Sequence, residues 1–363
     1  MDDLNFLLYI LSQSISSIKP ILIECLISWH ELYFCKSPAH IDIEEFLFCL
    51  RLSQEQDKKF RELRTNKSKE EFYQKVKNHN IQLVNLFDKH YPKSLIEIPD
   101  RPLLLYYQGN LDVLKKCNLA IVGSRAATTY GKNVVEKIIS GLSDYNFNII
   151  SGLAFGIDSQ SHIQALKNNL STTAVLGSSL EQENIYPKAN YRLAQNILEQ
   201  NGLIISEYPP GSSAMKHQFI ARNRIIAGLS ELVIIIEAAT KSGSLLTADF
   251  ALEYGRSVYA VPGSIFSPGS SGCHNLIAQG AGILTSAKNI LEEFNVEQKV
   301  TPDDSKFTEL QLRVLECIQM ESKELESIAV QTDIPIAELM GIISELELAQ
   351  KIKQTSSQTY SIF

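Results

Sequence analysis

Between residues 119 and 263 the chain repeats one unit, and this repeat limits its fold more than any other feature. Each unit has a short apolar run, a turn of glycine or serine residues, and a segment with apolar residues at helical spacing. The apolar runs are residues 119–122, 148–150, 173–176, 203–205, 232–236 and 258–261. The helical segments are residues 130–142, 159–167, 190–199 and 245–254, and one that ends near Gly228. Apolar strands alternating with helices predict an α/β fold, a doubly wound parallel sheet covered on both faces.

Two smaller modules flank the predicted sheet domain. Residues 1–80 have apolar side chains at helical spacing and predict a small helical module. Residues 294–307, which include Pro302 and two aspartates, predict a linker. Helices near 309–320, 325–331 and 336–346 then precede two short strands, the element order of a winged-helix module. The predicted boundaries are 1–84 for the N-terminal module, 85–293 for the sheet domain, 294–307 for the linker and 308–363 for the winged helix.

The second helix of a helix-turn-helix unit usually reads DNA with basic side chains. Here that helix, residues 336–346, has Glu338 and Glu345 but no lysine or arginine. We therefore expect the C-terminal module to contact protein rather than DNA.

The composition excludes several classes of protein. The formal net charge of −7 excludes a protein that is basic throughout. It permits a local basic groove, because salt confines such fields to roughly 10 Å. The six cysteines have no C-x-x-C pair and no matching histidine spacing, so we expect reduced thiols and no metal site. The acidic start and the interrupted apolar segment 4–28 resemble neither a signal peptide nor a membrane span. We expect a cytoplasmic protein without a cofactor or a membrane contact.

The turn Gly123-Ser124-Arg125 follows the first strand of the repeat. It is no dinucleotide fingerprint, because the next glycine is Gly131, and the chain has no phosphate-loop motif. A tight turn at a helix N-terminus still offers free amides and a positive dipole to an anion. Arg125 either grips a phosphate with its planar guanidinium or pairs with a carboxylate across the sheet edge.

Residues 216–224 combine cations with an aromatic side chain before the apolar helix that ends near Gly228. Cations for the backbone and a ring on which a base can stack are what single-strand binding requires. Taken singly, each cation is better explained as a solvated surface charge, whereas Phe219 is equally well explained as a core residue. Asn223 is either a helix cap or a polar contact. The candidate residues of this segment are Lys216, Phe219, Arg222, Asn223 and Arg224.

Small residues end every predicted strand, so one edge of the sheet has accessible backbone amides. Two such turns are further candidates for phosphate binding or for ordinary helix capping. They are Ser151-Gly152 and Ser242-Gly243-Ser244.

Support for catalysis is weak in this sequence. There is no G-x-S-x-G elbow. Asp158 precedes a helix and is most simply its N-cap, and His162 is more simply structural than a metal ligand. Glu207 and Glu237 lie at strand ends and can serve as acid or base, but neither has an evident partner in sequence. We expect a binding protein and no catalytic residue.

The order of these motifs resembles the DNA-processing protein A family of bacteria, also called DprA or Smf, over about residues 85–290. The matching phrases are Ile121-Val122-Gly123-Ser124-Arg125, the glycine-rich 151–158, Ala174-Val175-Leu176-Gly177, Ser206-Glu207-Tyr208-Pro209, Phe219 with 222–230, Glu237-Ala238, 242–245, 260–263 and 272–277.

The resemblance implies an extended Rossmann-like fold with an N-terminal SAM-like module and a C-terminal winged helix. It implies a homodimer that binds single-stranded DNA entering the cell in natural transformation, protects it and helps to load the RecA recombinase. The family's arginine turn, lysine and aromatic residue correspond to Arg125, Lys216 and Phe219.

A second family, the nucleoside-monophosphate phosphoribohydrolases, shares this architecture and gives the alternative of a nucleotide-binding or nucleotide-hydrolysing enzyme. Its glycine-rich turn and catalytic glutamate would fall at residues 241–247. Ala248 and Asp249 follow there in place of paired glutamates, so the binding function is preferred.

Overall fold

The computed structural model describes residues 2–14, 24, 26–27, 47, 50, 52–296, 308–318, 322–348, 351–356 and 358–362. The chain forms two compact units, Met1–Asn295 and Val296–Phe363. Most of the predicted linker, residues 297–307, lies outside the described residues. The predicted boundary at residue 84 falls within the first strand of the large sheet, and the proposed division of the first unit stays a prediction.

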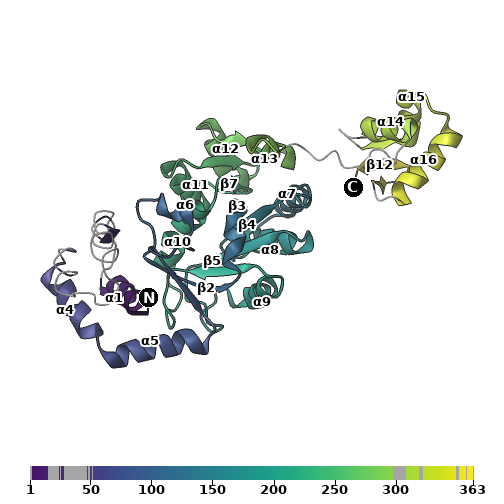
Figure 1. Ribbon diagram of the computed structural model, residues 1–363. Helices are drawn as coiled ribbons and strands as arrows, with labels where there is room; N and C mark the ends of the chain where they lie inside the picture. The colour runs from purple at the N-terminus through teal and green to yellow at the C-terminus, as the bar shows by residue number, and fades with distance from the viewer. Residues whose placement is uncertain are drawn as a thin grey trace. The chain divides into compact units, whose positions relative to one another are not determined.

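The first unit is built on a nine-stranded sheet (Figure 1). The order is β1-β2-β6-β5-β4-β3-β7-β8-β9, and the strands from β6 to β9 are parallel. In this order the strands are β1 (Gln82–Asn85), β2 (Leu104–Gly109), β6 (Leu203–Ser206), β5 (Ser171–Leu176), β4 (Phe147–Ser151), β3 (Cys117–Val122), β7 (Leu232–Ile235), β8 (Ser257–Ala260) and β9 (Gly282–Ile283). The six predicted strands are all present within a few residues of their predicted ends.

The predicted parallel sheet is confirmed, and an antiparallel hairpin that was not predicted extends it at one edge. β2 runs antiparallel to β6, and β1 runs antiparallel to β2. Gly109 ends β2 with a φ of +94°, and a side chain there would meet the carbonyl of Gly202. The edge hairpin was missed because β1 is only half covered and lacks the continuous apolar run of a central strand.

Helices cover both faces of the sheet, as predicted for a doubly wound fold (Figure 1). Alternate residues of β3 enter different cores, with Leu119 and Ile121 on one face and Ala120 and Val122 on the other. The helices of the sheet region are α6 (Lys93–Ile96), α7 (Thr129–Ser140), α8 (Ile157–Lys167), α9 (Tyr191–Glu199), α10 (Lys216–Leu229), α11 (Gly243–Glu253), α12 (Ser271–Ala278) and α13 (Ala287–Glu293). The core on one face includes side chains of α7 and α13, and the core on the other face includes side chains of α10 and α11.

The N-terminal segment is helical where it is described. Its helices are α1 (Asp2–Ser14), α4 (Gln54–Leu63) and α5 (Asn66–Asn78). Ser53 begins α4 with a capping box, and Thr65 caps α5. Buried side chains of α1, among them Leu8 and Leu11, share a core with the edge hairpin. Among the described residues, no helix is long and apolar enough to span a membrane.

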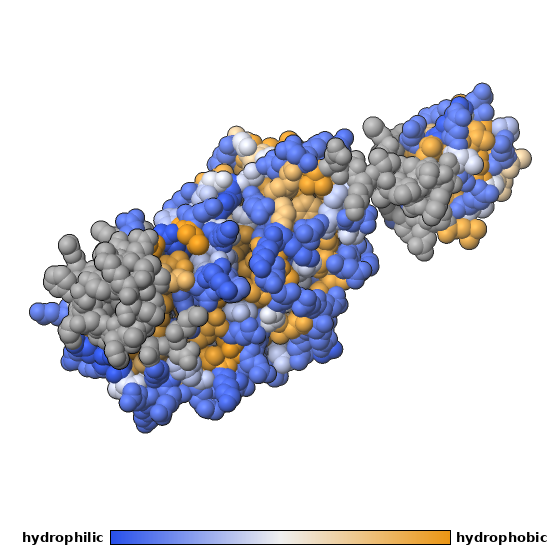
Figure 2. All heavy atoms as spheres, in the orientation of Figure 1, coloured by the Kyte–Doolittle hydropathy of each residue, from blue (hydrophilic) through white to orange (hydrophobic). Residues whose placement is uncertain are grey.

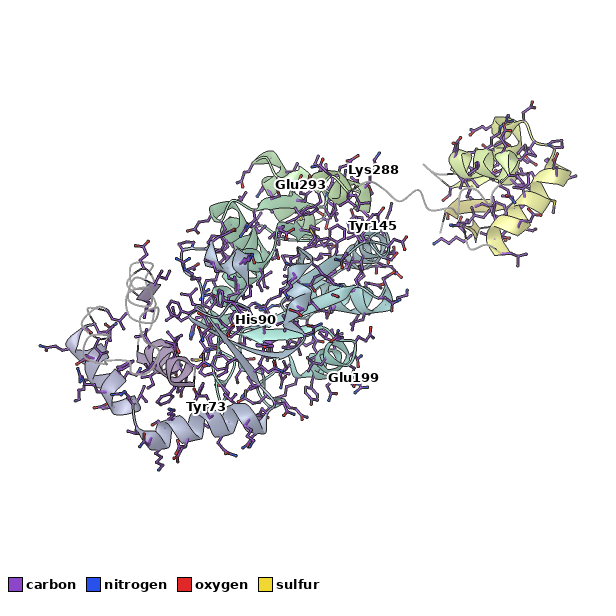
Figure 3. All side chains as sticks on the ribbon, in the orientation of Figure 1. Tyr73, His90, Tyr145, Glu199, Lys288 and Glu293 are labelled. Carbon is purple, nitrogen blue, oxygen red and sulfur yellow. The ribbon has the colours of Figure 1, made fainter. Side chains whose placement is uncertain are left out.

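Polar side chains tie α13 to strand β8 near one edge of the sheet. Glu293 of α13 accepts hydrogen bonds from the Ser257 hydroxyl at 2.5 Å and from the Tyr259 hydroxyl at 2.9 Å, and Figure 3 labels it among the side chains. Hydrophilic side chains cover much of the visible surface of this unit, with apolar ones between them (Figure 2).

The second unit has its own core around Val314, Ile328 and Leu339. Its elements are α14 (Glu309–Ile318), β10 (Lys323–Glu324), α15 (Leu325–Thr332), α16 (Ile336–Leu348), β11 (Ile352–Ser356) and β12 (Thr359–Ile362). The strands form an antiparallel sheet in the order β10-β12-β11. The predicted helices are found, β10 was not predicted, and the winged-helix assignment stays a prediction. The exposed residues of α16 include Met340 and Leu348. The expected protein contact also stays a prediction.

His162 of α8 is buried in a neutral form, as its structural role requires. Its Nδ1 lies 2.7 Å from the Thr172 hydroxyl, which donates to the Ile149 carbonyl at 2.8 Å. The hydroxyl therefore accepts, and Nδ1 carries the proton. Burial, with a smaller contribution from Arg222, lowers the pKa of His162 to about 3.

This pKa predicts an acid-sensitive contribution to stability. The unfolded histidine binds a proton below its ordinary pKa of 6.5, whereas the folded one stays neutral down to about pH 3. Stability therefore falls as pH drops from 7 to 5, by about 2 kcal/mol from this group. Urea unfolding should show a smaller fall over this range in His162→Gln than in the wild type. The exposed His217→Gln variant is the control, and equal falls in all three proteins would contradict the assignment.

Candidate functional site at the carboxyl edge of the sheet

A cleft of about 720 Å³ opens at the carboxyl edge of the sheet, where β3 and β7 end. The chain continues from β3 toward β4 on one side, while β7 pairs with β3 on the other. Such a reversal of strand order is where open α/β sheets bind ligands. The cleft is lined by Val122, Gly123, Ser124, Arg125, Ala154, Asp158, Tyr186, Ala214, Lys216, Phe219, Ile220, Arg222, Asn223, Ile226, Ala239, Lys241, Ser242, Gly243, Ser244 and Thr247.

The turn after β3 forms one wall of the cleft. The Ser124 amide donates to the Glu237 carbonyl at 2.8 Å, which joins the ends of β3 and β7. A side chain at Gly123 would lie 2.8 Å from Ile157, so the turn needs glycine at this position. Arg125 is exposed, and its guanidinium carbon lies 5.9 Å from the Phe219 ring centroid. Among the described residues Arg125 has no ion pair, which favours the phosphate-binding alternative for it over the carboxylate-paired one.

Helix α10 forms the opposite wall. The sequence predicts a basic segment that leads into a helix, but the helix itself begins at Lys216, so the cations are helical residues. Lys216, Phe219 and Asn223 then share one face, because residues three, four and seven apart stack along a helix. This face lines the cleft.

Phe219 is half-buried, so it is neither a full core residue nor a free surface ring. One side packs on Gly177, where a side chain would come within 2.8 Å of the ring. The Tyr186 ring lies 5.4 Å away at a 51° tilt and is 48% exposed. Tyr186 was not predicted as a site residue. It lies far along the chain from residues 216–224, and no local motif marks it.

Arg222 is buried in the floor of the cleft. Its guanidinium donates to the carbonyl of Gly152 at 2.7 Å and also to the carbonyl of Val175, and so joins the ends of β4 and β5. A side chain at Gly152 would lie 2.4 Å from the guanidinium, which accounts for the glycine. Burial lowers the pKa of Arg222 to about 10, and the Asp158 carboxylate opposes this shift.

Asp158 supports the same floor. The prediction that it caps its helix is wrong, because Gly156 is the N-cap of α8. The Asp158 carboxylate instead accepts from the amides of Gly152 at 3.1 Å and of Ala154 at 3.4 Å. Burial raises its pKa, and Arg222 lowers it. Ser151 and Gly152 lie behind the cleft rather than in its lining, and the Ser151 hydroxyl donates to the Ile121 carbonyl at 2.7 Å.

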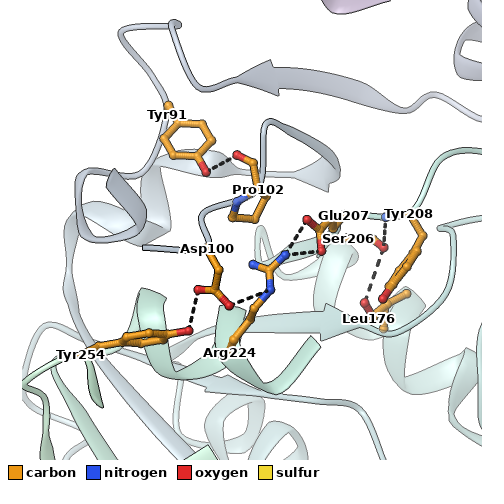
Figure 4. A network of polar contacts seen from close by, with 9 residues as sticks. All are labelled: Tyr91, Asp100, Pro102, Leu176, Ser206, Glu207, Tyr208, Arg224 and Tyr254. Atoms are coloured by element: carbon orange, nitrogen blue, oxygen red, sulfur yellow. Dashed lines mark hydrogen bonds and ion pairs between the residues drawn. The ribbon is translucent and has the colours of Figure 1, made fainter. Parts of the chain in front are cut away.

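Arg224 points away from the cleft into a polar network (Figure 4). It donates to both carboxylate oxygens of Glu207, at 2.5 and 2.6 Å, and its Nε lies 3.5 Å from Asp100. Asp100 also accepts from the Tyr254 hydroxyl at 2.6 Å. The network ties α10 to β6 and to the segment before β2. Glu207 is thereby engaged in a side-chain ion pair.

The Glu237 carboxylate also has hydrogen-bond partners. It is 4% exposed and accepts from the amide and hydroxyl of Thr128, at 3.0 and 2.5 Å. Gly131 leaves room for it, since a side chain there would lie 2.3 Å from the carboxylate. Both glutamates that the sequence offered as acid or base therefore hold structural hydrogen bonds.

The turn before α11 completes the cleft. Ser242 caps α11 by accepting from the Ser244 amide at 3.4 Å, as the capping alternative expects, and it also lines the cleft. The side-chain amide of Asn223 donates to the Gly243 carbonyl at 3.2 Å, which makes Asn223 a polar contact rather than a helix cap. Lys241 is exposed in the lining and was not among the predicted residues. Its place directly before the serine turn was the available signal.

The exposed charges of the cleft are positive. Arg125, Lys216 and Lys241 are exposed, and none of them has an ion pair within the part of the chain that the structure describes. Among the described residues of the lining, the one carboxylate is that of Asp158, which is buried and accepts two amide hydrogen bonds. Among the described residues no group of three or more histidine, cysteine or acidic side chains is placed to hold a metal ion.

Removing Arg224 should be strongly destabilising, because it leaves Glu207 and Asp100 without their cation in a largely buried site. Arg224→Leu should lower the free energy of unfolding by about 3 kcal/mol, measured by urea denaturation. The paired Arg224→Leu, Glu207→Leu variant should lose less, because the uncompensated charge is gone. Arg192→Leu, which breaks an exposed pair with Glu199, is the control and should change stability by no more than about 1 kcal/mol.

Comparisons with known proteins agree on one family. Residues 82–295 match the family of DNA recombination-mediator protein A. The chain is 50% identical over 210 residues to the DNA processing protein DprA of Streptococcus pneumoniae, covering 58% of this chain and 73% of the relative. It is 38% identical over 280 residues to the protein Smf of Escherichia coli, covering 74% of each.

Solved structures give the same result. The X-ray structure of DprA from Streptococcus pneumoniae matches with a TM-score of 0.70 at 37% identity, covering 80% of this chain and 97% of that one. A structure of DNA processing protein A from Helicobacter pylori, described for its single-stranded DNA binding mode, matches with a TM-score of 0.53 at 32% identity. It covers 59% of this chain and 96% of that one.

Proposed function

Because this chain belongs to the DNA recombination-mediator protein A family, whose members are also named DprA and Smf, we propose that its cleft binds single-stranded DNA. The observation that carries the proposal is that the exposed Arg125, Lys216 and Lys241 line one cleft together with a half-buried ring, Phe219. Cations hold the phosphates, and the ring stacks a base. The relative from Helicobacter pylori, whose structure is described for this binding mode, supports the choice of ligand.

The predicted binding has no sequence preference. Lysine and arginine contacts to phosphates position a strand but carry no base code.

The other residues predicted to bind DNA fall into groups according to their position relative to the cleft. Gly123, Ser124, Asn223 and Ser242 to Ser244 line the cleft and are proposed to contact the strand, Arg222 forms its floor, and Ser151, Gly152 and Arg224 support it from behind.

We propose the biological role that the family membership suggests. The protein receives single-stranded DNA in the cytoplasm during natural transformation, protects it and helps to load the RecA recombinase. Homodimerisation belongs to the same proposal. A monomeric mass at micromolar concentration by light scattering would contradict the dimer, and no acceleration of RecA assembly on coated DNA would contradict the loading role.

We also propose that no bond is broken in the cleft. The engagement of Glu207 with Arg224 and of Glu237 with Thr128 supports this, as does the sequence after residue 247, which lacks paired glutamates. The alternative is hydrolysis of a nucleoside monophosphate. Incubation of the pure protein with the four nucleoside monophosphates should release neither base nor phosphate, and release of either would favour the alternative.

The cations of the cleft should set the salt dependence of binding. In Arg125→Ala, Lys216→Ala, affinity for oligo(dT) should fall, and the slope of log affinity against log salt should flatten by about 0.7 for each lost phosphate contact. Fluorescence anisotropy across a salt series measures both. The control, Lys115→Ala, Lys167→Ala, removes two exposed cations outside the cleft and should keep the wild-type slope. Wild-type affinity and slope in the cleft variant would exclude this site.

Stacking of a base on Phe219 predicts a further loss of DNA affinity, independent of the cations. Phe219→Ala should weaken binding of oligo(dT) by roughly 1–3 kcal/mol at fixed salt. Phe219→Tyr keeps the ring and should bind within about threefold of the wild type. Equal losses in the two variants would contradict stacking of a base on this side chain, because Phe219→Tyr keeps the ring.

A further inference from the structure

Two large apolar side chains stand exposed on the loop that follows β8. Ile265 is 82% exposed and Phe266 is 89% exposed. They are neighbours in sequence, and no other pair of adjacent residues among the exposed large hydrophobic side chains of the described chain is as uncovered. Exposed apolar side chains gathered at one place mark a contact surface more often than scattered single ones.

Hydrogen bonds hold this loop in one shape. The Ser267 amide donates to the Ser264 carbonyl at 3.0 Å, and the Phe266 amide donates to the Ser264 hydroxyl at 3.2 Å. At its base, the Gly263 carbonyl lies 3.0 Å from Nε2 of His274. These bonds restrain the backbone of the loop, which lowers the entropy cost of ordering that backbone on binding.

The loop adjoins the cleft. It leaves β8 at the carboxyl edge, the edge at which β3 and β7 open into the cleft. Its continuation binds to the end of β7, because the Gly272 amide donates to the Ala238 carbonyl at 2.8 Å, and Ala239 lines the cleft. On the side of β3, the Tyr130 hydroxyl donates to the Pro262 carbonyl at 2.6 Å. Tyr130 lies in the first turn of α7, just after the Gly-Ser-Arg turn.

The charge of this segment suits a polyanion. The chain has 41 acidic residues, yet none lies between Tyr254 and Leu291. A phosphate backbone that passes over the loop meets no carboxylate from this segment, and the adjoining cleft offers exposed cations. An exposed aromatic side chain, here Phe266, near a cationic groove is the combination that single-strand binding uses.

We propose that a single strand leaving the cleft crosses the loop of residues 263–267, and that Phe266 with Ile265 forms a second platform on which a base packs. This inference rests on the proposed single-strand function of the cleft and extends its site along the sheet edge. The ligand is the part of the strand that is too long for the cleft, so the platform adds affinity only to longer strands.

The test compares oligo(dT) of increasing length, from roughly 4 to roughly 16 nucleotides, the range of site sizes in single-strand-binding domains. The variant is Ile265→Ser, Phe266→Ser in the full chain, and fluorescence anisotropy gives the dissociation constants. Both side chains are exposed, so the fold should be unaffected. The matched control is Val330→Ser, Leu348→Ser, which removes two apolar side chains that are 82% and 86% exposed in the other unit.

The loop variant should bind the shortest oligomer that the wild type binds with unchanged affinity. It should bind the longest about fivefold or more weakly, the loss expected for one stacked base. The control should match the wild type at every length. Wild-type affinity of the loop variant at all lengths would overturn the inference and leave the cleft proposal intact. An equal loss at every length, or a changed mass by light scattering, would also overturn it, because the loop would then serve the fold or a contact between protein chains.

A different result would contradict the cleft proposal. The Arg125→Ala, Lys216→Ala variant, which leaves residues 263–267 unchanged, would then bind DNA as tightly as the wild type. The two hypotheses are thus separated by two sets of variants measured with the same oligonucleotides.

Discussion

The geometry of the cleft depends on the buried guanidinium of Arg222. It joins α10 to the carbonyls that end β4 and β5, and the Asp158 carboxylate holds the amides of the same turn. A cation this deeply buried is stable only when it is hydrogen-bonded and compensated by an opposite charge. Because these bonds fix the rotation of α10, they decide that Lys216 and Phe219 face the cleft. A structural arginine thereby positions the residues proposed to bind DNA.

Arg222 and Arg224 show where prediction from the sequence ends. Both stand beside Asn223 in one basic segment, and composition does not distinguish them. The phase of the helix does, because it places Arg222 under the cleft and Arg224 in the network with Glu207 and Asp100. If the helix is assigned to begin after this segment, the positions of the cations around the helix axis are undefined. The correct start at Lys216 could have been expected only from tertiary contacts, since Met215 offers no polar side-chain cap.

The fold was more predictable than the site for a physical reason. The central strands are buried on both faces, and continuous apolar runs such as residues 232–236 follow directly from that burial. The edge strands β1 and β9 are partly exposed, so their sequences carry little periodic signal. The cleft brings together residues from distant turns. Arg125 and Phe219 were identified from local motifs, whereas Tyr186 approaches Phe219 only through the folding of the chain.

The sign of the charge along the sheet edge is set by pairing rather than by composition. Acidic residues stand at the ends of several strands, in a chain whose formal net charge is −7. Each has its own local partner: Glu207 pairs with the Arg224 cation, and Glu237 accepts hydrogen bonds from Thr128. Asp158, in α8 beside these strand ends, accepts hydrogen bonds from backbone amides. The exposed cations of the cleft, Arg125, Lys216 and Lys241, have no ion pair among the described residues, so their field reaches solvent. Since that field decays over roughly 10 Å at ordinary salt, acids elsewhere on the surface do not cancel it. An acidic protein can therefore present a cationic binding edge, provided that every carboxylate at that edge has its own donor.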